Sequence, residues 1–293
     1  MARPETIRRG PRKKASFWAR LRRRYDRVWT AHRLAQRKSR HRRSIGVSQQ
    51  KTPAFIFGCQ RSGTNMTLRV LNRLLDVDTF EEVDPRAFKH ARILGRDIQD
   101  KLIAESTAKC VVFKPICDSH RALELLSGRP NAKAIWVYRR YQDVANSAVY
   151  YWGDQTRTWI EDLLEGGGDW GVSQWNRENV TDECLAEIRE ACSEGLSVHG
   201  ACGLFWYMRN RTFFEQKLEA NPHTILADYE AMVTDPQKEF ARLSGFLDVA
   251  FHPSIVEKVF SSSIRKHEPP PMSERIHDLC RGMQERLDRA CRA

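Results

Sequence analysis

The feature that most constrains this chain is a strand-like run that leads through a polar loop into a helical pattern, all within residues 54–75. Residues 54–57 are continuously apolar, which fits a buried strand that ends at Gly58. The helical face that follows the loop consists of Leu68, Leu71, Leu74 and Leu75. Strand, loop and helix in this order direct backbone N–H groups and a helix N-terminus at one point, which suits a bound phosphate group.

Further apolar runs predict strands at 111–113, 134–138 and 224–226, with helical patterns starting near Gln142 and covering 236–247. Strands that alternate with helices predict an α/β fold of three layers, a mostly parallel central sheet with helices on both faces. We expect one such domain over residues 52–293 and a separate basic tail and linker over residues 1–51.

The net charge of +12 belongs to the tail and not to the body. Residues 1–50 contain 17 Lys and Arg against two acidic residues, whereas residues 51–293 contain 32 basic and 35 acidic residues. A body with a net charge near −3 argues against a nucleic-acid-binding domain, so no specific nucleic acid is expected as a partner.

The tail carries an apolar stripe at helical spacing with arginines between, and residues 35–51 resemble a linker. The stripe consists of Phe17, Leu21, Tyr25, Val28 and His32, flanked by Trp18 and Trp29. One interpretation is a helix that docks on the body; the other is a helix that contacts a membrane surface or a polyanion. An RNA-binding tail on an enzyme is a further alternative.

The rest of the composition predicts a cytoplasmic protein, with contact to a membrane surface as an option for the tail. No segment approaches the roughly 20 apolar residues that span a bilayer, and the N-terminus lacks the apolar core of a signal peptide. The eight cysteines form no CxxC pair, so we expect reduced, mostly buried thiols and no metal site. The sequence does not indicate an oligomeric state.

The loop Gly58–Asn65 has the glycine spacing of a Walker A loop but not its chemistry. Thr64 stands where the Walker lysine would be, and Asn65 replaces the Ser or Thr that binds Mg²⁺. Arg61 instead supplies a cation earlier in the loop, which suits a donor that leaves a 5′-phosphate without a metal.

A second anion-binding pattern follows the strand at 134–138. Arg139 ends this strand, and Ser147 comes about two helical turns later. Because parallel strands end at the same edge of a sheet, this arginine and the first loop are expected to meet and hold two phosphates of one nucleotide.

These segments together resemble the sulfotransferases that use 3′-phosphoadenosine-5′-phosphosulfate (PAPS). The segment 60–64 resembles their 5′-phosphosulfate loop, in the arginine-containing form of carbohydrate and tyrosylprotein sulfotransferases. The segment 139–147 resembles the 3′-phosphate motif, although Arg140 and Tyr141 replace the usual Asp-Pro. The segment 228–236 resembles a late family segment, and the similarity extends over about 52–270.

The resemblance implies a P-loop NTPase-like fold and transfer of sulfonate from PAPS to a hydroxyl acceptor, with release of adenosine 3′,5′-bisphosphate. It implies that Arg61 stabilises the charge on the leaving phosphate and that Lys114 contacts the sulfonate. The expected donor-binding residues are Gln60, Arg61, Ser62, Gly63, Thr64, Asn65, Arg139, Ser147 and Tyr229, and a looser match adds Ser261, Ser262, Ser263, Arg265 and Lys266.

The acceptor hydroxyl needs a general base, for which the sequence offers two candidates. Glu82 follows the first helix at the distance in sequence where related sulfotransferases have a glutamate that acts as base or contacts the substrate. The alternative interpretation is that Glu82 lies in a solvated acidic turn. His120 is the second candidate, although the histidine that cytosolic sulfotransferases place two residues after the lysine is here Ile116.

The acceptor itself stays open between a carbohydrate, a lipid headgroup, a small metabolite and a peptide tyrosine. The stretch 153–180 is rich in Gly and Trp, and part of it is predicted to be an irregular loop. This loop is either a substrate lid or a surface insertion, and the tryptophans favour a flat acceptor. The competing functions are a P-loop kinase-like phosphotransferase and a non-catalytic nucleotide-binding module tethered by its basic tail.

Overall fold

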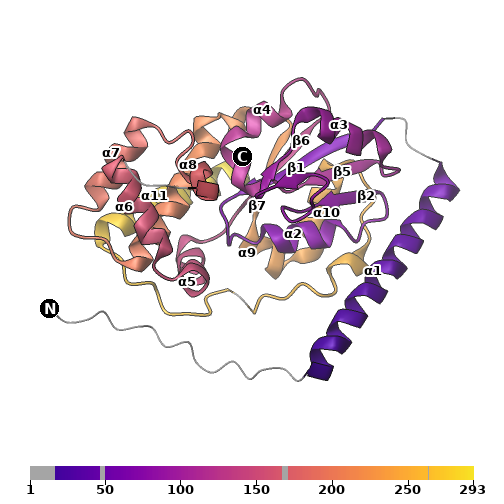
Figure 1. Cartoon of the computed structure of the whole chain (residues 1–293), viewed down its shortest axis with the longest axis horizontal. Coiled ribbons are helices and arrows are strands. Elements are labelled where there is room, and N and C mark those ends of the chain that lie inside the picture. Colours follow the sequence, from indigo (N-terminus) through magenta and orange to yellow (C-terminus); the bar gives the residue numbers. More distant parts are fainter. Residues whose placement is uncertain (1–16, 47–49, 167–170, 263) are drawn as a thin grey trace. The chain divides into compact units, whose positions relative to one another are not determined.

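The computed structural model describes residues 17–46, 50–166, 171–262 and 264–293, which divide into a unit that ends at Gly46 and a unit that begins at Val47 (Figure 1). The first unit is the helix α1 (Phe17–Ile45), which confirms a basic helix in the tail. The linker predicted for 35–51 is wrong over 35–45, because these Arg- and Lys-rich residues favour a helix that continues to Ile45, just before Gly46. Residues 1–16 of the tail, and the side chains of its stripe before Trp29, lie outside the described part.

The second unit contains a sheet of five parallel strands in the order β2-β5-β1-β6-β7. The strands are β1 (Thr52–Gly58), β2 (Val77–Phe80), β5 (Cys110–Phe113), β6 (Lys133–Tyr138) and β7 (Thr224–Asp228). A separate two-stranded antiparallel pair is formed by β3 (Phe88–Lys89) and β4 (Arg92–Ile93). All four predicted strands are confirmed, and β2 is a fifth that the sequence pattern missed because its apolar residues are only half of a short strand.

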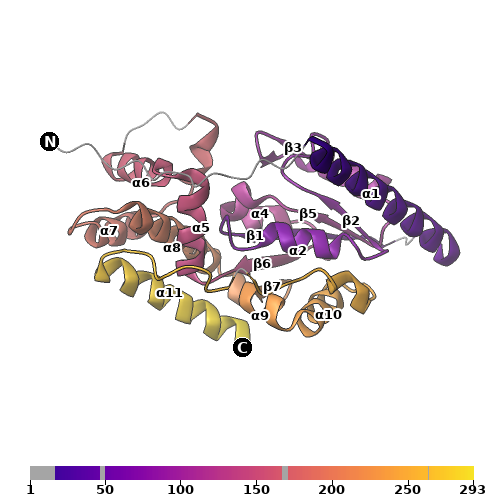
Figure 2. The same cartoon turned by 90° about the horizontal axis from the view of Figure 1, so that it is seen from below.

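Alternate residues of each strand pack on opposite faces, which produces the predicted three layers. On one face, Ala54 and Ile56 pack with the helices α2 (Thr64–Leu71), α9 (Tyr229–Thr234) and α10 (Pro236–Phe246). Figure 2 shows α9 and α10 side by side next to β7. On the other face, Phe55 and Phe57 pack with α4 (Ala122–Leu126) and α8 (Val198–Glu215).

The centre of the second face is α8, which is buried nearly all round. Three helices pack against it: α5 (Tyr141–Trp152), α6 (Gln155–Glu165) and α11 (Glu274–Arg292). Figure 1 shows these helices and α7 (Asp182–Ala191) grouped on the left of the view. The remaining elements are α3 (Arg96–Glu105), η1 (Ile116–Arg121), η2 (Gly171–Asn176), η3 (Leu218–Ala220) and η4 (Pro253–Val256).

The stretch 153–180 is more regular than predicted. The helix α6 occupies its first part and ends at Gly166, which has a φ of 69°. The irregular part predicted for this stretch therefore does not include 155–165, where no glycine interrupts the helical pattern. Gly167, Gly168 and Trp170 lie outside the described residues. Within the described part of the chain, none of the helices combines the length and the apolar character needed to span a membrane.

The cysteines are free, and six of the eight are buried, as predicted. Burial raises the pKa of the Cys59, Cys110 and Cys117 thiols to about 12, so they are uncharged at neutral pH.

Candidate functional site

The candidate site lies where the chain reverses its direction of travel across the sheet. From β1 the chain proceeds to β2 and returns through β5 on one side of β1, and then places β6 on the other side. At such a switch point the loops after neighbouring strands separate and leave room for a ligand at the carboxyl edge. The segments that follow β1, β5 and β6 contain Arg61, Lys114 and Arg139, so the topology brings the three predicted cations to one edge.

The shape of the loop after β1 depends on two glycines. Gly58 has a φ of 132°, and a Cβ there would lie 2.2 Å from the carbonyl oxygen of Val137. Gly63 begins α2 with a φ of 96°, and a Cβ there would lie 2.1 Å from Cδ2 of Tyr229. Glycine is therefore required at both positions, because any side chain would push the loop away from β6 and α9.

Arg61 connects the two predicted phosphate sites. Its Nε donates to Oγ of Ser147 at 3.1 Å, across 86 residues of sequence. Its guanidinium carbon also lies 3.7 Å from the ring centroid of Tyr151, one turn further along α5. These contacts hold the guanidinium over the loop, although Arg61 itself has a positive φ of 70°.

The other loop residues differ in exposure. Ser62 is buried and its Oγ lacks a hydrogen-bond partner among the described residues. Gln60 is half-buried and its Nε2 donates to Sγ of Cys117 at 3.9 Å. Thr64 is buried in the first turn of α2, whereas Asn65 is exposed. Unsatisfied polar groups in a folded loop indicate a place where a ligand supplies the missing partners.

A buried lysine, Lys114, and a half-buried glutamate, Glu82, form an ion pair just after the ends of β5 and β2. Lys114 is 1% exposed, and its Nζ donates to Oε2 of Glu82. Burial raises the pKa of the Glu82 carboxyl, and the Lys114 ammonium opposes that rise. The solvated turn considered for Glu82 is wrong, because the parallel pairing of β2 with β5 returns the chain after α2 to the sheet edge.

His120 lies in η1 and faces a different partner. Its Nε2 is 2.8 Å from Oε2 of Glu178, and Nδ1 is buried without a partner among the described residues. Burial lowers the pKa of His120 to about 4, assisted by the Arg209 charge and opposed by Glu178, so the ring is neutral near pH 7. Because the ring bonds to Glu178 and not to the Lys114–Glu82 pair, the geometry favours Glu82 over His120 as the base.

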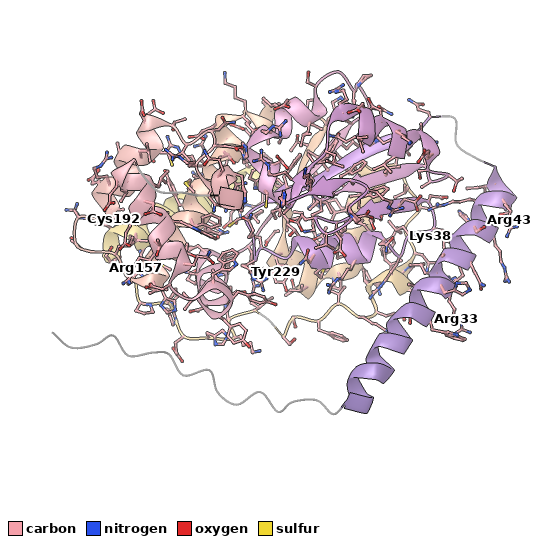
Figure 3. All side chains as sticks on the ribbon, viewed as in Figure 1. Arg33, Lys38, Arg43, Arg157, Cys192 and Tyr229 are labelled. Atoms are coloured by element: carbon pink, nitrogen blue, oxygen red, sulfur yellow. The ribbon has the colours of Figure 1, made fainter. Side chains whose placement is uncertain are left out.

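Arg139 is buried at the end of β6 between two carboxylates and an aromatic ring. Its Nη2 is 3.7 Å from Oδ2 of Asp143, and its Nε is 3.8 Å from Oε1 of Glu230. Its guanidinium carbon lies 4.5 Å from the ring centroid of Tyr229, the residue labelled near the middle of Figure 3. Burial and the neighbouring Asp228 raise the pKa of Glu230 to about 8.

The segment around Arg265 contacts the surroundings of Arg139 through its backbone. The N–H of Arg265 donates to Oδ2 of Asp143 at 3.3 Å, so the loose sequence match does bring this residue beside Arg139. The side chains of Arg265 and Lys266 are exposed, as are Ser261 and Ser262. Ser263 lies outside the described residues.

Three acidic residues of the site were not assigned from the sequence. Asp143 and Glu230 stand inside the segments 139–147 and 228–236, next to residues that were singled out, but their approach to Arg139 depends on the fold. Glu178 lies in the stretch 153–180 and no local pattern marks it, because its partners Arg92 and His120 are more than 50 residues away.

The fold is α/β, and the loop at this edge has the glycine spacing of a Walker A loop but not its lysine. A family model described as "Sulfotransferase domain" matches residues 51–271. The chain therefore belongs to the sulfotransferase family and is an enzyme that transfers sulfonate. The kinase-like and non-catalytic alternatives are wrong.

Solved structures similar to this chain are also sulfotransferases. The enzyme from Alicyclobacillus acidocaldarius is 16% identical, with 84% of this chain and 97% of that chain covered and a TM-score of 0.49. The enzyme STF9 from Mycobacterium avium is 12% identical, with 87% and 81% covered and a TM-score of 0.42. Mouse SULT7A1 complexed with PAP is 14% identical, with 78% and 68% covered and a TM-score of 0.41. A search of the curated proteins found no match. The family assignment rests on the family model and not on these structures.

Proposed function

We propose that this enzyme transfers sulfonate from PAPS to a hydroxyl group of its acceptor and releases adenosine 3′,5′-bisphosphate. The observation that carries the proposal is the hydrogen bond from Arg61 to Ser147, which joins the loop after β1 to the segment after β6. A donor with phosphates at both its 5′ and 3′ positions suits two such segments, because each segment supplies a separate anion-binding group.

The loop after β1 is the proposed 5′-phosphosulfate site. The backbone N–H groups of Gly63, Thr64 and Asn65 lie at the start of α2, where a helix attracts anions. Arg61 and the hydroxyl of Ser62 complete the site. The charge that develops on the bridging oxygen of the 5′-phosphate is then stabilised by Arg61, and a fixed cation of this kind contributes about 3 kcal/mol or more.

The segment after β6 is the proposed 3′-phosphate site. Arg139 supplies the charge, Ser147 a hydroxyl, and the residues around Arg265 close the site from the C-terminal side. Tyr229 packs against Arg139 and stands next to Gly63, so its ring lies between the two phosphate sites. This position suits a contact with the nucleoside that joins the two phosphates.

Lys114 and Glu82 are the proposed transfer groups. In the reaction the acceptor oxygen attacks sulfur, the bond between sulfur and the 5′-phosphate oxygen breaks, and the acceptor proton moves to the base. A sulfonate at Nζ of Lys114 competes with Glu82 for the ammonium. Glu82 then loses the partner that lowers its pKa, and it becomes a stronger base beside the acceptor.

Binding without any metal tests this function. The protein is treated with a chelator and titrated calorimetrically with adenosine 3′,5′-bisphosphate and with ADP. Tight binding of the bisphosphate and weak binding of ADP are expected, because ADP has no 3′-phosphate for Arg139. Equal binding of the two nucleotides, or a requirement for Mg²⁺, would contradict the proposal.

A further inference from the structure

Four side chains, on η1 or on segments that contact it, have buried polar atoms that lack hydrogen-bond partners in the described part of the chain. They are Gln60 Oε1, His120 Nδ1, Arg209 Nε, and both the Nδ2 and the Oδ1 of Asn176. His120, Asn176 and Arg209 are each at least 97% buried. Leaving such atoms without partners costs about 1–3 kcal/mol each, so a cluster of them indicates a ligand that supplies the bonds.

Arg209 is the only charged member of this cluster at neutral pH. It is 1% exposed on α8, and its Nη2 donates to the carbonyl of Ile116 at 3.1 Å. Its guanidinium carbon lies 5.1 Å from the ring centroid of Trp175, the residue before Asn176. Burial lowers its pKa, which shows that the charge is held there at a cost.

The neighbouring carboxylates are engaged by other arginines. Asp118 accepts from Arg92 at 2.6 Å, from Arg121 at 3.2 Å and from the N–H of Ile93 at 2.9 Å. Glu178 accepts two bonds from Arg92, at 3.0 and 2.8 Å. Within the described residues, no carboxylate lies within 4 Å of the Arg209 guanidinium, although Asp118 acts on it electrostatically.

The cluster adjoins both the donor loop and the transfer groups. Cys117 accepts from Gln60 of the loop and interacts electrostatically with Glu82, Lys114 and Arg209. His120, near the end of η1, also interacts electrostatically with Arg209, which bonds to Ile116 at the start of η1. A molecule bound to this cluster therefore lies near both the donor loop and the Lys114–Glu82 pair.

We propose that Arg209, with Asn176, binds an oxyanion carried by the acceptor, so that the acceptor is an anionic hydroxyl compound. The neutral ring of His120 donates through Nε2 to Glu178, so its Nδ1 would accept a hydrogen bond from a hydroxyl of the same molecule. A carboxylate, phosphate or sulfate group would accept from Arg209 Nε and Asn176 Nδ2, and Gln60 Oε1 would accept from a hydroxyl. This inference rests on the proposed function, because it assigns the acceptor side of the same site.

The test uses sugars that differ in one charged group. The full-length protein is saturated with adenosine 3′,5′-bisphosphate, which occupies the donor's own anion sites. It is then titrated at millimolar concentration with p-nitrophenyl glucoside and with three anionic counterparts, the glucuronide, the 6-phosphate and the 6-sulfate. A hydrogen-bonded buried charge predicts that at least one anionic sugar binds on the order of ten- to a hundredfold tighter than the glucoside.

Arg209→Met should abolish the preference for anionic sugars. Arg209→Lys keeps the positive charge and should retain part of the preference, and this variant is measured instead if Arg209→Met does not fold. The matched control is Arg286→Met, since Arg286 also lies over an aromatic ring of α8, at 3.7 Å from Phe214, and should change nothing. No preference for any anionic sugar, or a preference that survives Arg209→Met, overturns the inference. Failure of the bisphosphate to bind overturns the proposed function instead, so the two failures are distinguishable.

Discussion

The substitution Arg139→Ala tests the division of the donor site into two phosphate-binding segments. It removes a guanidinium whose side chain is 9% exposed, close to Asp143 and Glu230 and packed on Tyr229. A charge buried to this extent is little screened by salt, so its loss should act mainly on the phosphate that it faces. The expected result is a selective loss of affinity for the nucleotide with a 3′-phosphate.

The size of the loss follows from the type of contact. A hydrogen bond to a charged group contributes about 1.5–3 kcal/mol, which corresponds to roughly ten- to a hundredfold in affinity. Glu230, with a pKa of about 8, is largely protonated near neutral pH and adds little repulsion once Arg139 is removed. The bisphosphate should therefore bind the variant about as weakly as ADP binds the native protein.

Calorimetry with both nucleotides on the native protein and the variant measures this difference, and circular dichroism checks the fold. The matched control is Arg129→Ala, because Arg129 is also a buried arginine paired with a carboxylate, Asp100, but precedes β6 at the opposite edge of the sheet. An equal loss of affinity for both nucleotides, or no loss for the bisphosphate, would refute the assignment of Arg139 to the 3′-phosphate.

Four further predictions concern the loop and the carboxyl groups. Gly63→Ala should destabilise the protein and weaken bisphosphate binding, because the φ of 96° at this position and the neighbouring Tyr229 ring exclude a Cβ. The control Gly245→Ala, in α10, places a Cβ where nothing lies within 4 Å, and it should raise the free energy of unfolding in urea by about 0.5–1 kcal/mol. Arg61→Ala should slow bisphosphate release from PAPS by about a hundredfold or more, and an unchanged rate would exclude its role at the leaving group. The rate of transfer should rise with pH through the raised pKa of Glu82, because the base acts when deprotonated, and Glu82→Gln should remove this limb of the profile. Bisphosphate affinity should fall as pH rises through about 8, because ionised Glu230 competes with the 3′-phosphate for its cation, and a slope that persists in Glu230→Gln would point to another group.

Much of the fold was predictable because it depends on local patterns. Three of the four strands recognised from continuous apolar runs, β1, β5 and β6, are buried on both faces, where no polar alternation obscures the signal. The strand β2 was missed because Asp78 and Thr79 interrupt its apolar residues, and only pairing with β5 makes it a strand. The helix α1 continues past its apolar stripe because Lys, Arg and Gln have a high intrinsic helix propensity.

The candidate site divides in the same way. The loop 58–65 and the pair Arg139 and Ser147 are short segments, so their residue types and spacing were enough to predict an anion-binding role from the sequence. The carboxylates that surround Arg139 come from different elements, and the choice between Glu82 and His120 depended on which of them returns to Lys114.

The sequence by itself determined the order of the strands β1, β5, β6 and β7, the glycine loop that lacks the Walker lysine, and the concentration of positive charge before residue 51. Only the tertiary structure decided that Arg61 bonds to Ser147, that Glu82 pairs with Lys114, and that Arg209 is buried beside them without a carboxylate of its own among the described residues. The physical reason is that backbone conformation and apolar periodicity are local, whereas a site at the edge of a parallel sheet is assembled from strands that are distant in the sequence and adjacent only after folding.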